Sequence, residues 1–154
     1  MDEDKKKLWK QAIKWPLYSV AILPVLITAA YLLNQYEKVK IFNLIAFTLA
    51  AILILLWENL TNDLFDAETG IDEFKLHSIV NLVKNKAIIS FIAYTALFTG
   101  LLIVSIISLS TSINILILVA VCCFLGYLYQ GPPFRFGYQG LGAVSYTHLR
   151  AHET

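Results

Sequence analysis

Four long apolar segments restrict what this chain can fold into. They cover residues 15–33, 41–60, 87–109 and 113–129, and Glu58 is the one charged residue among them. A helix needs about 20 predominantly apolar residues to cross the hydrocarbon of a bilayer. The chain is also 58% hydrophobic and only 15% charged, which is unlike a soluble domain. The sequence therefore predicts an all-α integral membrane helix bundle with about four transmembrane helices, in contact with membrane lipid.

The polar residues divide the chain into three parts. Residues 1–14 form a basic segment, residues 15–142 hold the apolar segments, and residues 143–154 are polar and continue no membrane pattern. We expect the last part to be disordered or foreign to the protein, with no function of its own, and the native sequence to stop near Gly142.

The distribution of positive charge predicts the orientation in the membrane. One side would carry nine basic residues, namely Lys5, Lys6, Lys7, Lys10, Lys14, Lys75, Lys84, Lys86 and Arg135. The other side would carry Lys38 and Lys40. Because cytoplasmic loops of membrane proteins are rich in lysine and arginine, we expect the N-terminus and the 61–86 connection to be cytoplasmic, at a plasma or thylakoid membrane. The net charge of +1 indicates no nucleic-acid partner.

The second apolar segment runs into a cluster of amides and carboxylates. Asn59, Asn62, Asp63 and Asp66 are spaced three or four residues apart, which places them on one face of a helix. Asp72 follows Gly70, where the chain can turn back, so three carboxylates could converge. Ionisable residues at a membrane helix are expensive unless they are paired or bind a cation. This face is therefore a candidate functional site.

Hard oxygen ligands of this kind suit Mg²⁺, which binds one or two carboxylates together with substrate phosphates. We expect Asp63, Asp66 and Asp72 to hold the metal and Asn59 and Asn62 to contact substrate. We also expect the aspartates to lie at an exposed helix end, so that replacing them changes stability little. The alternative is a solvated acidic loop at the membrane surface. The spacing does not match a calcium-binding EF-hand.

A second cluster follows the fourth apolar segment, in residues 129–142. Two prolines break the helix and four glycines allow the backbone to approach a ligand. Arg135 could neutralise a phosphate oxygen, and Tyr129 and Tyr138 could line an aromatic pocket. The alternative is an interfacial loop in which the arginine only extends to the membrane surface.

Together the two clusters resemble the UbiA superfamily of intramembrane prenyltransferases. The first aspartate-rich motif of that family has the form N-D-x-x-D followed by a further Asp, and Asn62, Asp63, Asp66 and Asp72 match it. Three longer strings resemble the 1,4-dihydroxy-2-naphthoate prenyltransferases, most closely their phytyltransferase branch: NDLFDAETGID (62–72), HSIVNLVKNK (77–86) and YQGPPFRFGYQGLG (129–142). The resemblance covers roughly residues 8–142.

The resemblance implies transfer of a phytyl or polyprenyl group from its diphosphate to 1,4-dihydroxy-2-naphthoate. Magnesium at Asp63 and Asp66, the expected catalytic residues, would grip the diphosphate. The naphthoate ring would capture the resulting carbocation and lose CO₂. The family fold implies nine transmembrane helices and a second aspartate-rich motif, which this sequence does not contain. We therefore expect the chain to be an N-terminal fragment without activity on its own.

Three other readings remain open at the level of sequence. A related prenyltransferase acting on another aromatic acceptor would share the same aspartate motif. A cation transporter fragment would use Asp63 and Asp66 to conduct or gate an ion. A noncatalytic membrane scaffold would leave the one-sided aspartate face without a purpose. The motif resemblance favours the naphthoate prenyltransferase over all three.

Overall fold

The computed structural model describes residues 3–36, 39–69 and 78–139, and within these ranges it contains helices and no strand. The elements are α1 (Glu3–Ile13), α2 (Trp15–Tyr36), α3 (Ile41–Thr69), α4 (Ile79–Val83), α5 (Lys86–Leu109), α6 (Ile113–Gln130) and a short 3₁₀ helix, η1 (Phe136–Gln139). The predicted all-α class is confirmed.

Four helical stretches are long and apolar enough to cross a membrane, as predicted: Lys6–Tyr36, Ile41–Thr69, Lys86–Leu109 and Ile113–Gln130. Many large apolar side chains on these helices face outward, among them Phe42, Phe91 and Leu109, which are 76%, 74% and 84% exposed. Such exposure is favourable in lipid, where no water has to be excluded. The chain therefore fits a multi-pass membrane protein.

The observed helices extend beyond the predicted apolar segments. The apolar segment predicted to end at residue 60 is followed by the aspartate face, which continues the same helix to Thr69, as its spacing predicted; the segment predicted to end at residue 33 continues as helix to Tyr36. Hydropathy marks where the lipid ends. Residues with amide or carboxylate side chains can still continue the backbone hydrogen bonds of a helix into the aqueous interface. Two helices were not predicted at all, because α1 is rich in lysine and α4 has only five residues. The expected boundary at residue 143 lies outside the described residues.

The centre of the bundle is the contact between α3 and α5, the most extensive contact between any two described elements. Gly100 on α5 allows the close approach. A Cβ atom at this position would meet Ile54 Cγ1 at 3.0 Å and the Ala50 carbonyl oxygen at 3.2 Å. Small residues at membrane helix contacts let two backbones pack closely, which replaces the hydrophobic driving force that lipid does not supply.

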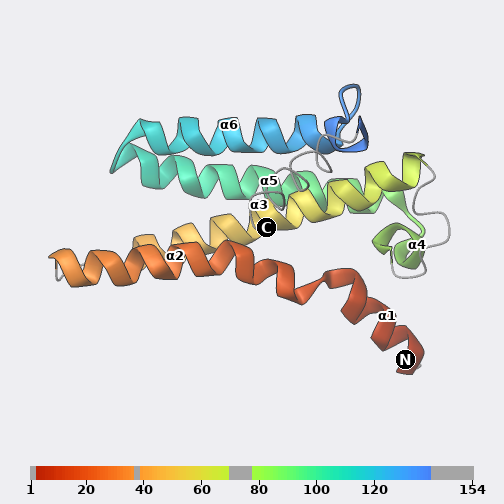
Figure 1. Ribbon diagram of the computed structural model, residues 1–154, viewed down its shortest axis with the longest axis horizontal. Helices are drawn as coiled ribbons and strands as arrows, with labels where there is room; N and C mark the ends of the chain where they lie inside the picture. Colours follow the sequence, from red (N-terminus) through yellow and green to blue (C-terminus); the bar gives the residue numbers. More distant parts are fainter. Residues whose placement is uncertain (1–2, 37–38, 70–77, 140–154) are drawn as a thin grey trace, which may run out of the picture.

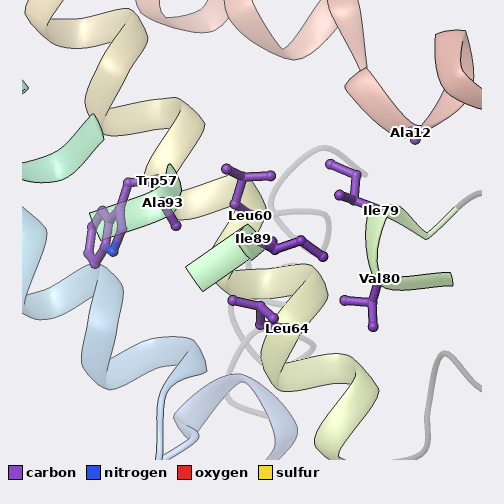
Figure 2. Close-up of a cluster of buried hydrophobic side chains, with 8 residues drawn as sticks. All are labelled: Ala12, Trp57, Leu60, Leu64, Ile79, Val80, Ile89 and Ala93. Atoms are coloured by element: carbon purple, nitrogen blue, oxygen red, sulfur yellow. The ribbon is translucent and has the colours of Figure 1, made fainter. Parts of the chain in front are cut away.

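The N-terminus, the end of α3, α4, the start of α5 and the end of α6 lie at one end of the bundle (Figure 1). A cluster of buried apolar side chains occupies this end and draws on four helices (Figure 2). Its members are Ala12 of α1, Trp57, Leu60 and Leu64 of α3, Ile79 and Val80 of α4, and Ile89 and Ala93 of α5. The cluster holds α1 and α4 against the end of α3, where the predicted site residues are.

Replacing Gly100 by leucine should destabilise the fold by about 1–3 kcal/mol, because the new side chain has no space between α3 and α5. Gly126→Leu is the matched control, since a Cβ there meets only the Glu58 side chain, at 3.5 Å or more. Unfolding of the two variants in mixed detergent would measure the difference. Equal stability of both variants would contradict this account of the α3–α5 contact.

Candidate functional site

Asp63 is a fully buried carboxylate at this end of the bundle. The residue is 0% exposed, although it lies near the end of a long membrane helix. Its Oδ1 atom accepts a hydrogen bond from Lys14 Nζ at 3.1 Å, and its Oδ2 atom accepts one from the Ile79 backbone N–H at 3.1 Å. Both carboxylate oxygens are therefore paired, each with a different part of the chain, as a buried charge requires.

Asn59, one turn before Asp63 on α3, binds the same ammonium group. Lys14 Nζ donates to Asn59 Oδ1 at 2.9 Å, so the lysine lies between the amide and the carboxylate. Asn59 is also buried, and within the described residues its Nδ2 donor has no hydrogen-bond partner. The predicted helical face thus already holds a positive charge. It also keeps one buried N–H donor, Asn59 Nδ2, that is free to donate to a further acceptor.

The expectation that Asp63 lies at an exposed helix end is wrong. Because α3 continues past residue 60 and α4 packs back against it, the carboxylate is enclosed. Removing the carboxylate would leave the Ile79 N–H, a donor in the buried part of the site, without its partner, which is destabilising. Replacing Asp63 therefore affects the stability of this end of the bundle as well as its chemistry, and functional tests need a measurement of folding beside them.

The segment after α6 reaches α3 through two side chains. The Tyr138 hydroxyl donates a hydrogen bond to Asp66 Oδ1, and Arg135 Nη2 pairs with Glu68 Oε2 at 2.9 Å. Burial, followed by the hydrogen bond and negative charge of Asp66, raises the pKa of Tyr138 to about 12. The hydroxyl therefore stays protonated at neutral pH and remains a donor to Asp66. Two of the three predicted residues of the second cluster, Arg135 and Tyr138, therefore reach the aspartate end of α3.

The end of α6 is also attached to α3 directly. Gln130 Nε2 donates to the Glu58 carbonyl oxygen at 3.2 Å and to Thr61 Oγ1 at 3.0 Å. Gln130 is buried, so these bonds satisfy an amide that would otherwise be costly to enclose. They fix where the chain leaves α6, and hence where the following loop can place Arg135 and Tyr138.

The structure does not bring every predicted residue into this arrangement. Asn62 is half-buried, and Tyr129 is 50% exposed with its ring against Gly137. Asp72 lies outside the described residues, so the predicted convergence of three carboxylates stays a prediction. Within the described part of the chain, no group of three or more histidine, cysteine, aspartate or glutamate side chains is placed to hold a metal.

Sequence reasoning missed Lys14 as a member of the site. It was counted only among the basic residues that predict orientation, and its partners are 45 and 49 residues away along the chain. A lysine directly before an apolar run was the available signal, but such residues commonly extend to the membrane surface. Glu68 was missed in the same way, because an exposed glutamate at the end of a helix has many possible partners.

An apolar cavity of about 240 Å³ adjoins Asn59. Most of its lining is aliphatic, from α3, α4 and α5, and includes Leu60, Ile79 and Ile89. Tyr18 of α2 and Asn59 also line it, but they present only apolar surface to the cavity, so the polar atoms of Asn59 lie beside it and not on its wall. Polar binding groups and apolar space are therefore next to one another at this end of the bundle, which suits a ligand with a charged head and an apolar tail.

Two named proteins are similar to this chain. It is 44% identical over 142 residues to the 2-carboxy-1,4-naphthoquinone phytyltransferase of Synechocystis, covering 90% of this chain and 46% of that protein. It is 41% identical over 140 residues to the chloroplastic 2-carboxy-1,4-naphthoquinone phytyltransferase of Arabidopsis thaliana, covering 89% of this chain and 36% of that protein. The chain is homologous to these phytyltransferases. The resemblance predicted from the motifs is confirmed.

This chain spans less than half the length of either phytyltransferase that it matches. No protein-family model matches it, and no solved structure matches it significantly. The similarity to phytyltransferases extends over nine-tenths of the chain, so it includes most of the bundle and is not limited to one motif. The site around Asp63 can therefore be interpreted as part of a chain that is homologous to the two phytyltransferases.

Replacing Tyr138 by phenylalanine should release the loop after α6, because it removes the hydroxyl that donates to Asp66. The loss of one such bond is worth about 1 kcal/mol, so amide hydrogen exchange in residues 131–139 should become about fivefold faster. Tyr129→Phe is the matched control, since the Tyr129 hydroxyl forms no hydrogen bond with the described part of the chain. Exchange rates in the two variants that do not differ would contradict a role for Tyr138 in holding the loop.

Proposed function

We propose that this chain forms part of an intramembrane prenyltransferase that acts on a prenyl diphosphate and a naphthoquinone-type acceptor. The observation that carries this proposal is the ammonium group of Lys14, which Asn59 and Asp63 hold between them. It lies at the end of a membrane helix bundle that is homologous to phytyltransferases. A diphosphate is repelled by bare carboxylates. A face of α3 that binds a cation can hold the diphosphate, because the cation attracts the phosphate oxygens.

The residues at this face fit a magnesium ion. Their ligand atoms are carboxylate and amide oxygens, which Mg²⁺ prefers, and a positive charge already lies between Asn59 and Asp63. We assign Asp63 and Asp66 as its ligands, with Asp72 as a further one. When bound, Mg²⁺ would neutralise the charge that develops on the diphosphate as the allylic C–O bond breaks.

The remaining polar groups of the site would position the diphosphate. Asn59 Nδ2, a buried donor without a partner among the described residues, is suited to a phosphate oxygen. Arg135 can present its guanidinium from the loop after α6, beside the end of α3 that carries Asp66. Tyr138 keeps the Asp66 carboxylate oriented. We assign Asn62 and Tyr129 to the rim of the same substrate site.

The apolar surroundings suit the prenyl chain. The cavity beside Asn59 is lined mostly by aliphatic side chains, so it could take the first isoprene units while the rest of the tail lies among the helices or in lipid. A dry apolar wall would also keep water from an allylic carbocation. We propose a phytyl group as the transferred chain, because both similar proteins are named phytyltransferases.

The acceptor follows from the names of the same two proteins. Both act on 2-carboxy-1,4-naphthoquinone by name. A carbocation is captured by an electron-rich ring, so we propose that the reduced form, 1,4-dihydroxy-2-naphthoate, reacts in this site. Attack from the ring carbon that bears the carboxylate, followed by loss of CO₂, restores the aromatic ring. The product would be a precursor of phylloquinone or menaquinone.

We also propose that the site faces the cytoplasm. The lysine-rich helix α1, the end of α3 and the end of α6 that leads to Arg135 are at one end of the bundle (Figure 1). Basic residues concentrate on the cytoplasmic side of membrane proteins. A charged diphosphate and a carboxylate-bearing acceptor would then approach from water, while the prenyl chain enters from the bilayer.

A chimaera tests this function directly. The matching part of the Synechocystis relative would be replaced by this chain, and membranes would be assayed with Mg²⁺, phytyl diphosphate and 1,4-dihydroxy-2-naphthoate. We expect phytylated product, and we expect Asp63→Asn or Asp66→Asn to lower the rate by at least about 100-fold, because each removes stabilisation of the transition state.

The control variant is Glu3→Gln, which removes an exposed carboxylate on α1 that belongs to neither the proposed metal site nor the substrate site. Because Asp63 is buried, thermal unfolding must accompany each assay. A folded chimaera that makes no product, or one whose activity survives both aspartate substitutions, would contradict the proposed function.

A further inference from the structure

Lys14 has an unusual position and conformation. It is the turn residue between α1 and α2, and its φ angle is 51°. Residues with a side chain seldom adopt this left-handed conformation, which favours glycine. Backbone strain of this kind persists only where the surroundings hold it, and it tends to occur at functional sites. Here the side chain is held by two hydrogen bonds, to Asn59 and Asp63.

The ammonium group of Lys14 and a divalent cation would need the same oxygen atoms. Nζ lies 2.9 Å from Asn59 Oδ1 and 3.1 Å from Asp63 Oδ1. A magnesium ion would bind at about 2.1 Å from its ligand oxygens. The other oxygen of Asp63 is engaged by the Ile79 backbone, so it offers no equivalent position. The two cations therefore compete for one place.

We propose that Lys14 is an internal cation that occupies the divalent-cation position of the metal-free protein and leaves it when the metal binds. This inference rests on the proposed function, because it assumes that Asp63 binds a metal. The lysine would keep the buried carboxylate neutralised and the site assembled between turnovers. Its side chain is 32% exposed whereas that of Asp63 is 1% exposed, so the lysine can withdraw toward solvent while the carboxylate stays in place.

The surrounding structure allows this exchange. Lys14 lies between two helices, at a turn, and not within a continuous helix that would have to break. Ala12, two residues earlier, is 0% exposed and packs in the cluster with Ile79 and Val80, so α1 can remain attached while the lysine moves (Figure 2). Once displaced, the ammonium group would remain at the edge of the site, beside the incoming diphosphate.

The test measures the reactivity of individual lysine amines in the full chain in lipid nanodiscs. An amine-acetylating reagent is applied in EDTA or with Mn²⁺, and modification of Lys14 and Lys10 is followed by mass spectrometry. Electron paramagnetic resonance of free Mn²⁺ reports binding in the same samples. Lys10, which lies on α1 four residues before Lys14 and is exposed, is the internal control.

We expect Mn²⁺ to raise the acetylation rate of Lys14 about fivefold, the change for an ion pair worth about 1 kcal/mol, and to leave Lys10 unchanged. In Asp63→Asn, Lys14 should react at the faster rate without metal. The matched substitutions Lys14→Met and Lys10→Met remove the same charge, but only the first should tighten Mn²⁺ binding by about fivefold.

The possible outcomes separate this inference from the function on which it rests. If Mn²⁺ binds through Asp63 while Lys14 reacts at an unchanged rate, the inference is overturned and the metal site stands. If Mn²⁺ does not bind, or binds equally well in Asp63→Asn, the proposed metal site and the inference both fail. Faster reaction of Lys14 together with Asp63-dependent binding supports both.

Discussion

The burial of the Asp63 carboxylate is the constraint on which the rest of this end of the bundle depends. An unpaired charge in this position would cost several kcal/mol, so the chain must bring partners to it. Lys14 comes from the turn between α1 and α2, and the Ile79 N–H comes from the start of α4. Meeting this one requirement places the turn after α1 and the start of α4 against the same turn of α3.

A second layer of contacts attaches the C-terminal half of the described chain to the same helix. Gln130 bonds to the backbone and to Thr61 of α3, and Tyr138 and Arg135 bond to Asp66 and Glu68. Polar contacts are concentrated at this end, whereas the helices beyond it present large apolar side chains outward. This division matches a protein that binds a charged group at the membrane surface and keeps apolar chains in lipid.

The sequence predicted the helices and one face of the site well, and for a clear physical reason. Hydropathy marks membrane spans strongly, and the spacing of Asn59 and Asp63 guarantees a shared helical face. What it could not predict depends on contacts between distant residues. The pairing of Lys14 with Asp63 joins positions 49 residues apart, and the enclosure of Asp63 follows from α4, a helix too short to leave a periodic pattern. From composition alone, Lys14 and Asp63 both look like residues of the membrane surface.

The most direct test of this account is a double-mutant cycle between Lys14 and Asp63 in metal-free protein. The free energy of unfolding would be measured for the wild type, Lys14→Met, Asp63→Asn and the double variant, with Lys10→Met replacing Lys14→Met in a control cycle. If the pair holds this end of the bundle together, the Lys14–Asp63 cycle should give a coupling energy of about 1–2 kcal/mol, and the control cycle should be additive. Additivity of Lys14→Met and Asp63→Asn within about 0.5 kcal/mol would contradict the account.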